Sequence, residues 1–289
     1  MHNIPKSGIL RTNSHVLKRD KLHNGTSHWI DELLANGRTA FSLKEARKTF
    51  PKQSEVAIMR SLNRLSRKEK IVSIHQGYYI IIPPQYASRG ILPPTSYLDG
   101  LMKFLKRPYY VGLLNAAAFY GAAHQQPQEF FVVTNYPRLR PTKRKGLIVN
   151  YVSKNEIPEK LLESRKTESG YIKVSSPELT AADLIQFEKR IGGLDRTSTV
   201  LNELAEEMKP EKFDKEFFKH VSIATIQRLG YLLDGVLNKE ELAASLYEKI
   251  QQMKLELYRL PLKASGKIKG FSYNEKWKII INTDIEVDE

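Results

Sequence analysis

Hydrophobic residues in the first part of the chain recur at helical spacing in three segments, which we expect to form three helices. The first helix is predicted over residues 27–36, where an apolar stripe repeats every three to four positions. In the second, FSLKEARKTFP, Ser42 caps the helix and Glu45 follows three residues on, as in a capping box. The third helix is predicted over residues 54–69, with its apolar residues on one face.

Two segments rich in β-branched and aromatic residues follow the third helix. KIVSI and GYYIII are separated by HQG, a pattern that predicts a β-hairpin turning at Gly77. Three helices followed by a hairpin form the winged helix-turn-helix arrangement. In that arrangement the third helix enters the major groove of DNA, and the hairpin touches the flanking backbone or the minor groove.

Two Pro-Pro pairs with Gly90 between them interrupt the chain at IIPPQYASRGILPPTS, which cannot lie within a helix or a central strand. We therefore expect three parts: a winged helix-turn-helix domain at residues 1–84, a proline-rich linker at 85–95 and a larger domain at 96–289. Residues 1–26 form an arm of the first domain for which no element is predicted.

The remaining sequence alternates helical and strand patterns. Two helices, YLDGLMKFLK and YVGLLNAAAFYGAA, precede three predicted strands, EFFVVT, GLIVNYVS and YIKVS. A helix at SPELTAADLIQFEKR, at least three amphipathic helices and a last strand, KWKIIIN, follow before an acidic tail. The predicted fold class is mixed α/β (α+β), an N-terminal winged helix-turn-helix plus a larger α/β domain with trailing helices.

Charge is unevenly distributed along the 289 residues, whose formal net charge is +14. Residues 1–84 hold 15 Lys and Arg against 6 Asp and Glu, whereas residues 85–289 hold 31 against 26. A basic surplus concentrated in under a third of the chain indicates a local polyanion partner, most often nucleic acid. A solubilising surface charge is the alternative explanation.

The outward face of the third helix is basic and carries no acid. It mixes amide, guanidinium and apolar side chains, which suits the base edges of the major groove. Residues near the helix start are expected to read bases, and the other basic side chains to hold phosphates. The predicted base-reading residues are Gln53, Val56 and Arg60. The full predicted DNA-binding set is Lys44, Lys52, Gln53, Ser54, Val56, Arg60, Asn63, Arg64, Arg67, His75 and Gln76.

The densest charge feature is RLRPTKRK, which we expect to be a loop between two strands. Its basic residues are Arg138, Arg140, Lys143, Arg144 and Lys145, with no acid among them. Like charges packed so closely repel one another, which favours a role in gripping DNA, RNA or an acidic partner protein. A solvated hairpin loop is the alternative.

Catalytic motifs are sparse, so we expect no enzymatic activity, no cofactor and no bound metal. The chain has no cysteine, which excludes thiol catalysis, and its seven histidines show neither metal-ligand spacing nor a paired carboxylate. A metal-dependent nuclease needs a carboxylate two residues before a strand lysine, yet Lys173 has Tyr171 there. Glu178 and Asp183 are expected to be a helix cap and a core-edge polar residue.

Three segments then resemble a known family. YVGLLNAAAFYGAAHQQPQEFFVVTNYPR, VSSPELTAADLIQFEKRIGGLDRTSTVLNELAEEM and IQRLGYLLD are similar to the C-terminal domain of AbiEi-type antitoxins. The segment from Ser42 to Pro83 is similar to the winged helix of that family. The resemblance implies a type IV toxin–antitoxin system linked to abortive infection of phage. It also implies that Lys52, Gln53, Ser54, Arg60, Arg64 and the wing tip read DNA.

The resemblance further implies that the winged helix represses the operon by binding double-stranded operator DNA. The C-terminal domain would counter a nucleotidyltransferase toxin, in this family without a stable complex. Two other hypotheses are a nucleic-acid-processing, nuclease-like enzyme in the C-terminal domain and a protein-interaction scaffold. The start of the chain lacks an apolar segment typical of a signal peptide, and no apolar run is long enough for a membrane span. We expect a cytoplasmic protein that has no membrane partner.

Overall fold

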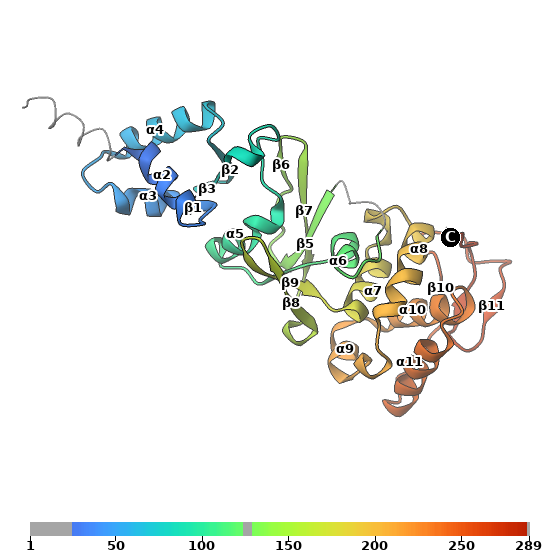
Figure 1. Ribbon diagram of the computed structural model, residues 1–289. Helices are drawn as coiled ribbons and strands as arrows, with labels where there is room; N and C mark the ends of the chain where they lie inside the picture. The colour runs from blue at the N-terminus through green and yellow to red at the C-terminus, as the bar shows by residue number, and fades with distance from the viewer. Residues whose placement is uncertain (1–24, 124–128, 288–289) are drawn as a thin grey trace, which may run out of the picture. The chain divides into compact units, whose positions relative to one another are not determined.

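The computed structural model describes residues 25–123 and 129–287. Most of the arm expected at residues 1–26 and the last two residues of the acidic tail lie outside this part of the chain. The chain divides into two compact units, residues 1–92 and 93–289 (Figure 1). Each unit is described by itself below. The domain boundaries expected from the proline pairs remain a prediction.

The N-terminal unit contains the three expected helices and the expected hairpin. The helices are α2 (Thr26–Ala35), α3 (Leu43–Thr49) and α4 (Glu55–Arg67). The hairpin strands are β2 (Ile71–His75) and β3 (Tyr78–Ile81). A further strand, β1 (Ala40–Ser42), pairs antiparallel with β3, so the sheet order is β1-β3-β2. This third strand was not predicted, because three residues are too few to show an alternating pattern.

Serine side chains begin two of these helices. The Ser42 hydroxyl oxygen accepts a hydrogen bond from the Glu45 backbone N–H (3.1 Å), as a helix cap does. The carboxylate of Glu45 accepts hydrogen bonds from Arg38 at 2.5 and 3.0 Å. Ser54 caps α4 in the same way, accepting from the Ala57 N–H (3.2 Å). These caps fix where the second and third helices start.

Aromatic rings fill the core of the N-terminal unit. Phe41 of β1 stacks on Tyr79 of β3 with ring centroids 5.3 Å apart. Trp29 of α2 lies edge-on to Phe41 (5.0 Å) and to Phe50 (5.7 Å). Such offset and edge-on pairs are the favoured arrangements of aromatic side chains. The rings therefore tie the sheet to the helices.

The proline pairs begin short 3₁₀ turns, which suits the fixed φ angle of proline. These turns are η1 (Pro84–Tyr86) and η2 (Pro94–Ser96). Between them Ile91 and Leu92 are buried. The segment thus contains two turns and buried apolar side chains.

A six-stranded sheet forms the centre of the C-terminal unit, in the order β6-β7-β5-β4-β9-β8. Its strands are β4 (Tyr109–Val111), β5 (Glu129–Asn135), β6 (Thr142–Arg144), β7 (Leu147–Lys154), β8 (Leu162–Thr167) and β9 (Gly170–Ser175). The pairs β5–β7 and β4–β9 are parallel, and the others are antiparallel. The fold class is mixed α/β, as predicted.

Two parts of this sheet correct the sequence interpretation. YVGLLNAAAFYGAA was expected to be one helix, but its first residues form the central strand β4 and only α6 (Leu113–Phe119) is helical. Gly112 lies between the strand and the helix. Glycine fits there because any Cβ would lie only 2.9 Å from the side chain of Val133. Strand β8 was missed, since its polar sequence LESRKT lacks the usual strand pattern.

Helices cover the rest of the C-terminal unit. They are α5 (Leu98–Leu105), α7 (Pro177–Gln186), α8 (Leu194–Leu204), α9 (Lys215–His220), α10 (Ile223–Gly235) and α11 (Glu240–Gln252). Helix α7 contacts α6, α8 and α10, and α10 also contacts α11 (Figure 1). Buried side chains join helices α6 to α11 to the sheet in one hydrophobic cluster, and those of α5 pack with the sheet in a second cluster. Three short 3₁₀ turns lie between these helices: η4 (Glu188–Arg190), η5 (Ala205–Glu207) and η6 (Pro210–Lys212). A further turn, η3 (Glu159–Leu161), lies between β7 and β8.

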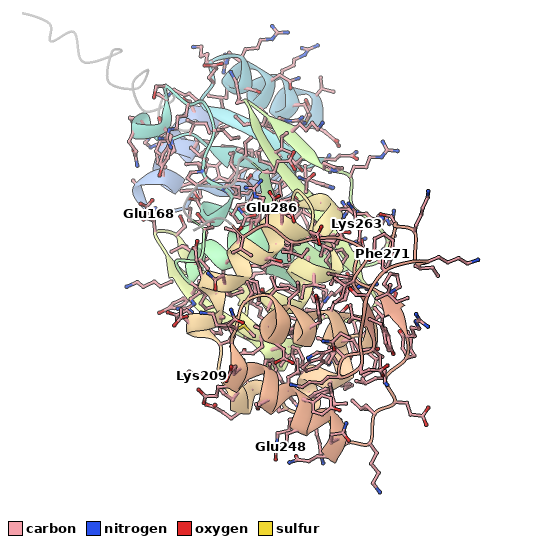
Figure 2. All side chains as sticks on the ribbon, turned by 90° about the vertical axis from the view of Figure 1, so that its right-hand side faces the viewer. Glu168, Lys209, Glu248, Lys263, Phe271 and Glu286 are labelled. Carbon is pink, nitrogen blue, oxygen red and sulfur yellow. The ribbon has the colours of Figure 1, made fainter. Side chains whose placement is uncertain are left out.

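A small second sheet follows the last helix. Strand β12 (Ile279–Ile280) pairs with β10 (Leu260–Pro261) and β11 (Tyr273–Asn274), and is shorter than the predicted strand KWKIIIN. Phe271, just before β11, is 44% exposed (Figure 2). Trp277, in contrast, is completely buried.

Candidate functional site

Helix α4 separates apolar and polar side chains sharply. Its inner side is buried through Ile58, Leu62 and Leu65, which are at most 4% exposed. The residues proposed to meet DNA are exposed on the other side: Gln53, Val56, Arg60, Asn63, Arg64 and Arg67. Val56 is 58% exposed. An apolar group within a cationic and amide surface is one that a thymine methyl can contact.

Other charges adjoin this face. Glu55, the first residue of α4, is an exposed acid whose carboxylate pairs with Arg47 of α3. Lys44 of α3 and Lys52, in the turn before α4, are exposed. Ser54 is also exposed, and its oxygen accepts the capping hydrogen bond described above, so its hydroxyl hydrogen and one lone pair remain for a partner.

The tip of the β2–β3 hairpin is exposed and irregular. The pairing register shifts between Ser73 and His75, as a β-bulge does. Gly77 has a φ of 76°, which glycine adopts without strain. The His75 ring nitrogen Nδ1 lies 3.2 Å from the backbone oxygen of Gln76. Both side chains are exposed at the tip.

The basic segment from Arg138 to Lys145 is not only a loop, as expected, because part of it forms the edge strand β6. Lys145 and Gly146 have φ values of 49° and 81°, and two positive values in succession are what a type I′ hairpin turn requires. The side chains of Arg140, Lys143, Arg144 and Lys145 are exposed along this β6–β7 hairpin. Arg138 is also exposed and lines a cleft with Lys154.

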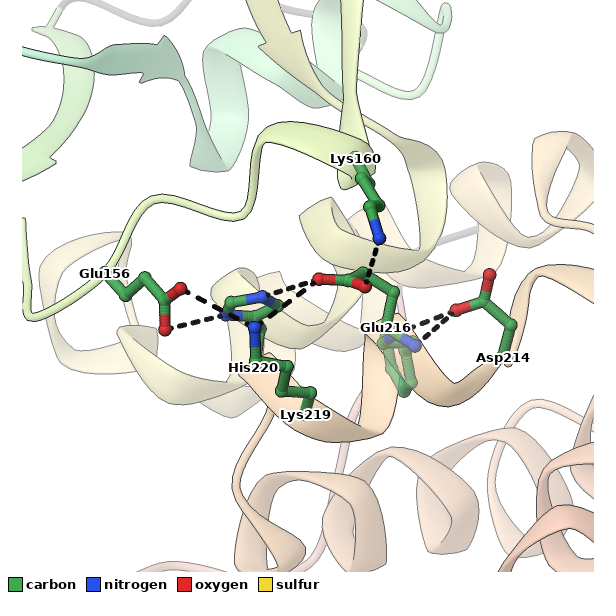
Figure 3. Close-up of polar contacts among 7 residues, drawn as sticks. Glu156, Lys160, Asp214, Glu216, Lys219 and His220 are labelled. Carbon is green, nitrogen blue, oxygen red and sulfur yellow. Dashed lines mark hydrogen bonds and ion pairs between the residues drawn. The ribbon is translucent and has the colours of Figure 1, made fainter.

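A histidine network escaped the sequence interpretation, which expected no histidine–carboxylate pairing. His220 Nε2 lies 3.0 Å from Glu216, four residues earlier on α9, and Nδ1 lies 3.7 Å from Glu156 (Figure 3). Lys160 and Lys219 also contact Glu216, at 3.1 and 3.9 Å. The spacing of His220 and Glu216 would have revealed one pair, since residues four apart on a helix are neighbours. His28 and Glu32 on α2 form another such pair (3.1 Å).

Asp183 was expected at the core edge but is fully buried. Its carboxylate accepts a hydrogen bond from the Tyr110 hydroxyl (2.6 Å) and pairs with the ammonium of Lys154. Burial raises the pKa of Tyr110 well above its ordinary value, and the charge of Asp183 raises it further. Tyr110 therefore stays protonated and keeps donating. Glu178, in the first turn of α7, is also buried and accepts from the Lys209 N–H (2.9 Å).

The lysine weighed for nuclease chemistry has a structural partner. Lys173 of β9 pairs with Glu159, and Tyr171 is 63% exposed. Across residues 25–123 and 129–287, no three His, Asp or Glu side chains come together in a way that would ligate a metal ion.

In the part of the chain that the structure describes, every helix is too short or too polar to cross a membrane.

Three comparisons with known proteins bear on this architecture. The chain is similar to the crystal structure of the RV2827C protein from Mycobacterium tuberculosis, with 14% identity and a TM-score of 0.63 over 88% of this chain and 90% of that one. An antigenic nucleotidyltransferase-like protein from Paracoccidioides brasiliensis has a TM-score of 0.33 and 11% identity, over 53% and 89% of the two chains. No curated protein sequence matches significantly.

The first of these structures shows that the fold spans both units of the chain. A family model, the AbiEi antitoxin C-terminal domain, matches residues 110–235, from strand β4 to the end of α10. This range includes the six-stranded sheet and the Tyr110–Asp183–Lys154 contacts. The chain therefore carries the C-terminal domain of an AbiEi-type antitoxin, as the resemblance of its sequence implied.

Proposed function

We propose that the chain is an antitoxin that also represses its own operon. Its N-terminal unit, a winged helix, binds double-stranded operator DNA through α4 and the β2–β3 hairpin. Its C-terminal domain counters a nucleotidyltransferase toxin encoded beside it, and this action takes place in the cytoplasm, with a role in phage defence. The antitoxin domain at residues 110–235 is the single observation that carries the toxin–antitoxin assignment.

The exposed face of α4 supports the DNA-binding part of the proposal. Three arginines, Arg60, Arg64 and Arg67, point away from the core, while the apolar residues of the same helix are buried beneath them. Arginine suits this role because its planar guanidinium makes paired hydrogen bonds to guanine or to phosphate. The neighbouring acid, Glu55, is paired with Arg47, so its charge is offset.

The hairpin supplies a second contact. Its tip is exposed, carries a histidine and an amide side chain, and is connected to α4 by only a short turn. A wing in this position touches the DNA backbone or minor groove beside the helix. The basic β6–β7 hairpin of the C-terminal domain is a further surface for DNA or for an acidic partner protein, because its side chains are exposed and of one sign.

Operator binding tests the repressor part of this proposal. The variant Arg60→Ala/Arg64→Ala should lose the gel shift of DNA from the chain's own promoter. At salt concentrations where weak binding is still measurable, the plot of log affinity against log salt should flatten by about one to two units. Lys267→Ala/Lys269→Ala is the matched control, since it removes the same charge from exposed positions outside the proposed surface.

Toxin neutralisation tests the other part separately. Co-expression with the neighbouring toxin should show that the Arg60→Ala/Arg64→Ala variant still protects cells, because these residues lie outside the antitoxin domain. Normal operator binding by this variant would overturn the DNA-binding proposal. If the wild-type chain does not protect cells from the neighbouring toxin, the antitoxin assignment itself is overturned.

A further inference from the structure

A cleft of about 510 Å³ lies in the C-terminal unit where the parallel strands β5 and β7 end. Asn135 and Lys154, the last residues of these strands, are paired across the sheet. Tyr136, Arg138 and Glu156, which follow the strand ends, line the cleft. In open α/β sheets, ligands bind in the crevice beyond the carboxyl ends of the strands. The volume lies in the usual range for small-molecule sites.

Positive charge dominates the lining of the cleft. Arg138, Lys154, Arg190 and Lys219 contribute cationic groups, against one acid in the lining, Glu156, and the buried Asp183 that pairs with Lys154. The charge of Glu156 is offset, because Lys219 lies 3.7 Å from its carboxylate and His220 lies at the same distance (Figure 3). Over the described residues, Arg138 and Arg190 make no ion pair or side-chain hydrogen bond with another group. Two guanidinium groups are thus available for an anion.

Lys154 is held in place from beneath. Its ammonium pairs with Asp183, which is fully buried and is itself bonded to Tyr110. The Lys154 side chain is only 11% exposed, so it is fixed at the base of the cleft. An ammonium group has three hydrogen-bond donors, and Asp183 occupies one of them. The remaining donors can serve a phosphate oxygen.

The cleft also contains neutral groups suited to an anion. The Ser153 hydroxyl oxygen is buried and has no hydrogen-bond partner among the residues that the structure describes. A buried polar atom without a partner is unusual and calls for a ligand or a water. Ser222, which caps the first turn of the 13-residue helix α10, lines the cleft as well. The positive end of a helix dipole favours negative charge.

Aromatic rings line the same cleft. Tyr136 is 48% exposed at its edge, and Tyr151 and Phe187 form part of its wall. Exposed aromatic faces next to arginine stack on nucleobases without needing a particular sequence. Phosphate-binding cations and stacking surfaces therefore occur in one cavity of suitable size.

We propose that this cleft binds a nucleoside triphosphate, with its phosphates on Arg138, Arg190 and Lys154 and its base against Tyr136. This site belongs to the antitoxin domain but is separate from DNA reading by α4. An adjoining hollow of about 440 Å³ shares Phe187 and Arg190 with the cleft. Its other arginine, Arg228, already donates to the backbone oxygens of Pro261 and Leu262, so it offers less to an anion.

Isothermal titration calorimetry of the full chain tests the proposal, with ATP, GTP, CTP, UTP and inorganic pyrophosphate as probes. We expect one nucleoside triphosphate per chain. Arg138→Ala and Arg190→Ala should each weaken its binding about tenfold or more, since each removes a charged hydrogen bond to phosphate. Tyr136→Ala should weaken triphosphate binding about fivefold or more and leave pyrophosphate binding unchanged, because only the base stacks.

Arg140→Ala is the matched control, because Arg140 is exposed two residues from Arg138 but does not line the cleft. It should change affinity less than about twofold, as screening reduces the effect of a distant surface charge. Thermal unfolding of each variant with and without ATP checks that it folds, and Arg138→Gln and Arg190→Gln replace any variant that does not.

Three results would overturn the proposal. One is no binding of any triphosphate at millimolar concentration by the folded chain. Another is an equal loss of affinity in Arg138→Ala and Arg140→Ala, which would indicate only general attraction to a basic surface. The third is pyrophosphate binding as tight as ATP binding with no effect of Tyr136→Ala, which would indicate an anion site without a nucleotide.

Discussion

The indole ring of Trp277 packs directly on Gly230 of α10: a Cβ at position 230 would lie 2.0 Å from the indole Cζ3. The ring is fully buried, and its Nε1–H donates to Asp234 (2.8 Å), one turn further along the helix. One turn earlier, the Gln227 amide donates to the backbone oxygen of Trp277 (2.8 Å). Successive turns of α10 thus bind the end of the chain to the antitoxin domain.

We expect Gly230→Ala to destabilise the C-terminal unit by about 3 kcal/mol, because the added methyl group overlaps a ring that has no space to move. Alanine is otherwise the better helix former. Urea unfolding followed by tryptophan fluorescence measures the loss. Gly235→Ala on the same helix is the control, since a Cβ added there would lie 3.1 Å from its nearest neighbour, the Tyr231 ring, which must shift only slightly. Equal stability of the two variants would contradict the packing argument.

The buried pair of Asp183 and Lys154 leads to a second prediction. Asp183→Asn keeps an acceptor for Tyr110 but leaves the Lys154 ammonium without its counter-charge. Breaking a buried pair in this way costs about 3 to 5 kcal/mol. Glu163→Gln, which breaks an exposed pair with Arg165, should cost at most about 1 kcal/mol. Chemical unfolding of both variants gives the comparison, and similar losses would show that burial does not set the cost.

The pH dependence of stability gives a third prediction, through Asp234. Burial alone would raise the pKa of its carboxyl, but hydrogen bonds from Lys276 and Trp277 outweigh this, and the pKa falls below its ordinary value of 3.8. A carboxyl whose pKa is lower in the folded state stabilises the fold above its unfolded pKa. This contribution is lost as the pH falls through the folded pKa.

Asp234→Asn should therefore destabilise the chain at pH 5 to 7, and the difference from wild type should shrink below about pH 4. Denaturant unfolding of both proteins from pH 3 to 7 measures this trend, and Glu211→Gln at an exposed position is the control. A difference that stays constant down to pH 3 would contradict the assigned role of Asp234.

The sequence was most informative about features that depend on a single helix or hairpin, such as which side chains are buried and where a helix begins. The periodicity of α4 predicted the burial of Ile58, Leu62 and Leu65, and Ser42 and Ser54 marked the starts of two helices. Both features depend on residues at most four positions apart, so a local sequence pattern is enough to predict them. The exposure of the proposed DNA-reading face follows from the same periodicity.

Contacts between distant segments could not be predicted in this way. Tyr110 and Asp183 are 73 positions apart, and they meet Lys154 only through the pairing order of the sheet and the packing of α7 on it. The strand β4 reads as part of a helix, because its three residues are too few to show a period. The cleft at the ends of β5 and β7 combines residues from β7, η4 and α9, so no single sequence motif predicts it.

The charges of the outermost strands have a consequence for self-association. Strands β6 and β8 form the two edges of the six-stranded sheet, and an edge offers unpaired backbone groups to any neighbouring molecule. Lys143 and Arg144 on one edge, and Arg165 and Lys166 on the other, bring like charges together if two copies align. Lys143 and Arg144, which suit a polyanion, therefore also oppose aggregation through the edge of the sheet that they occupy.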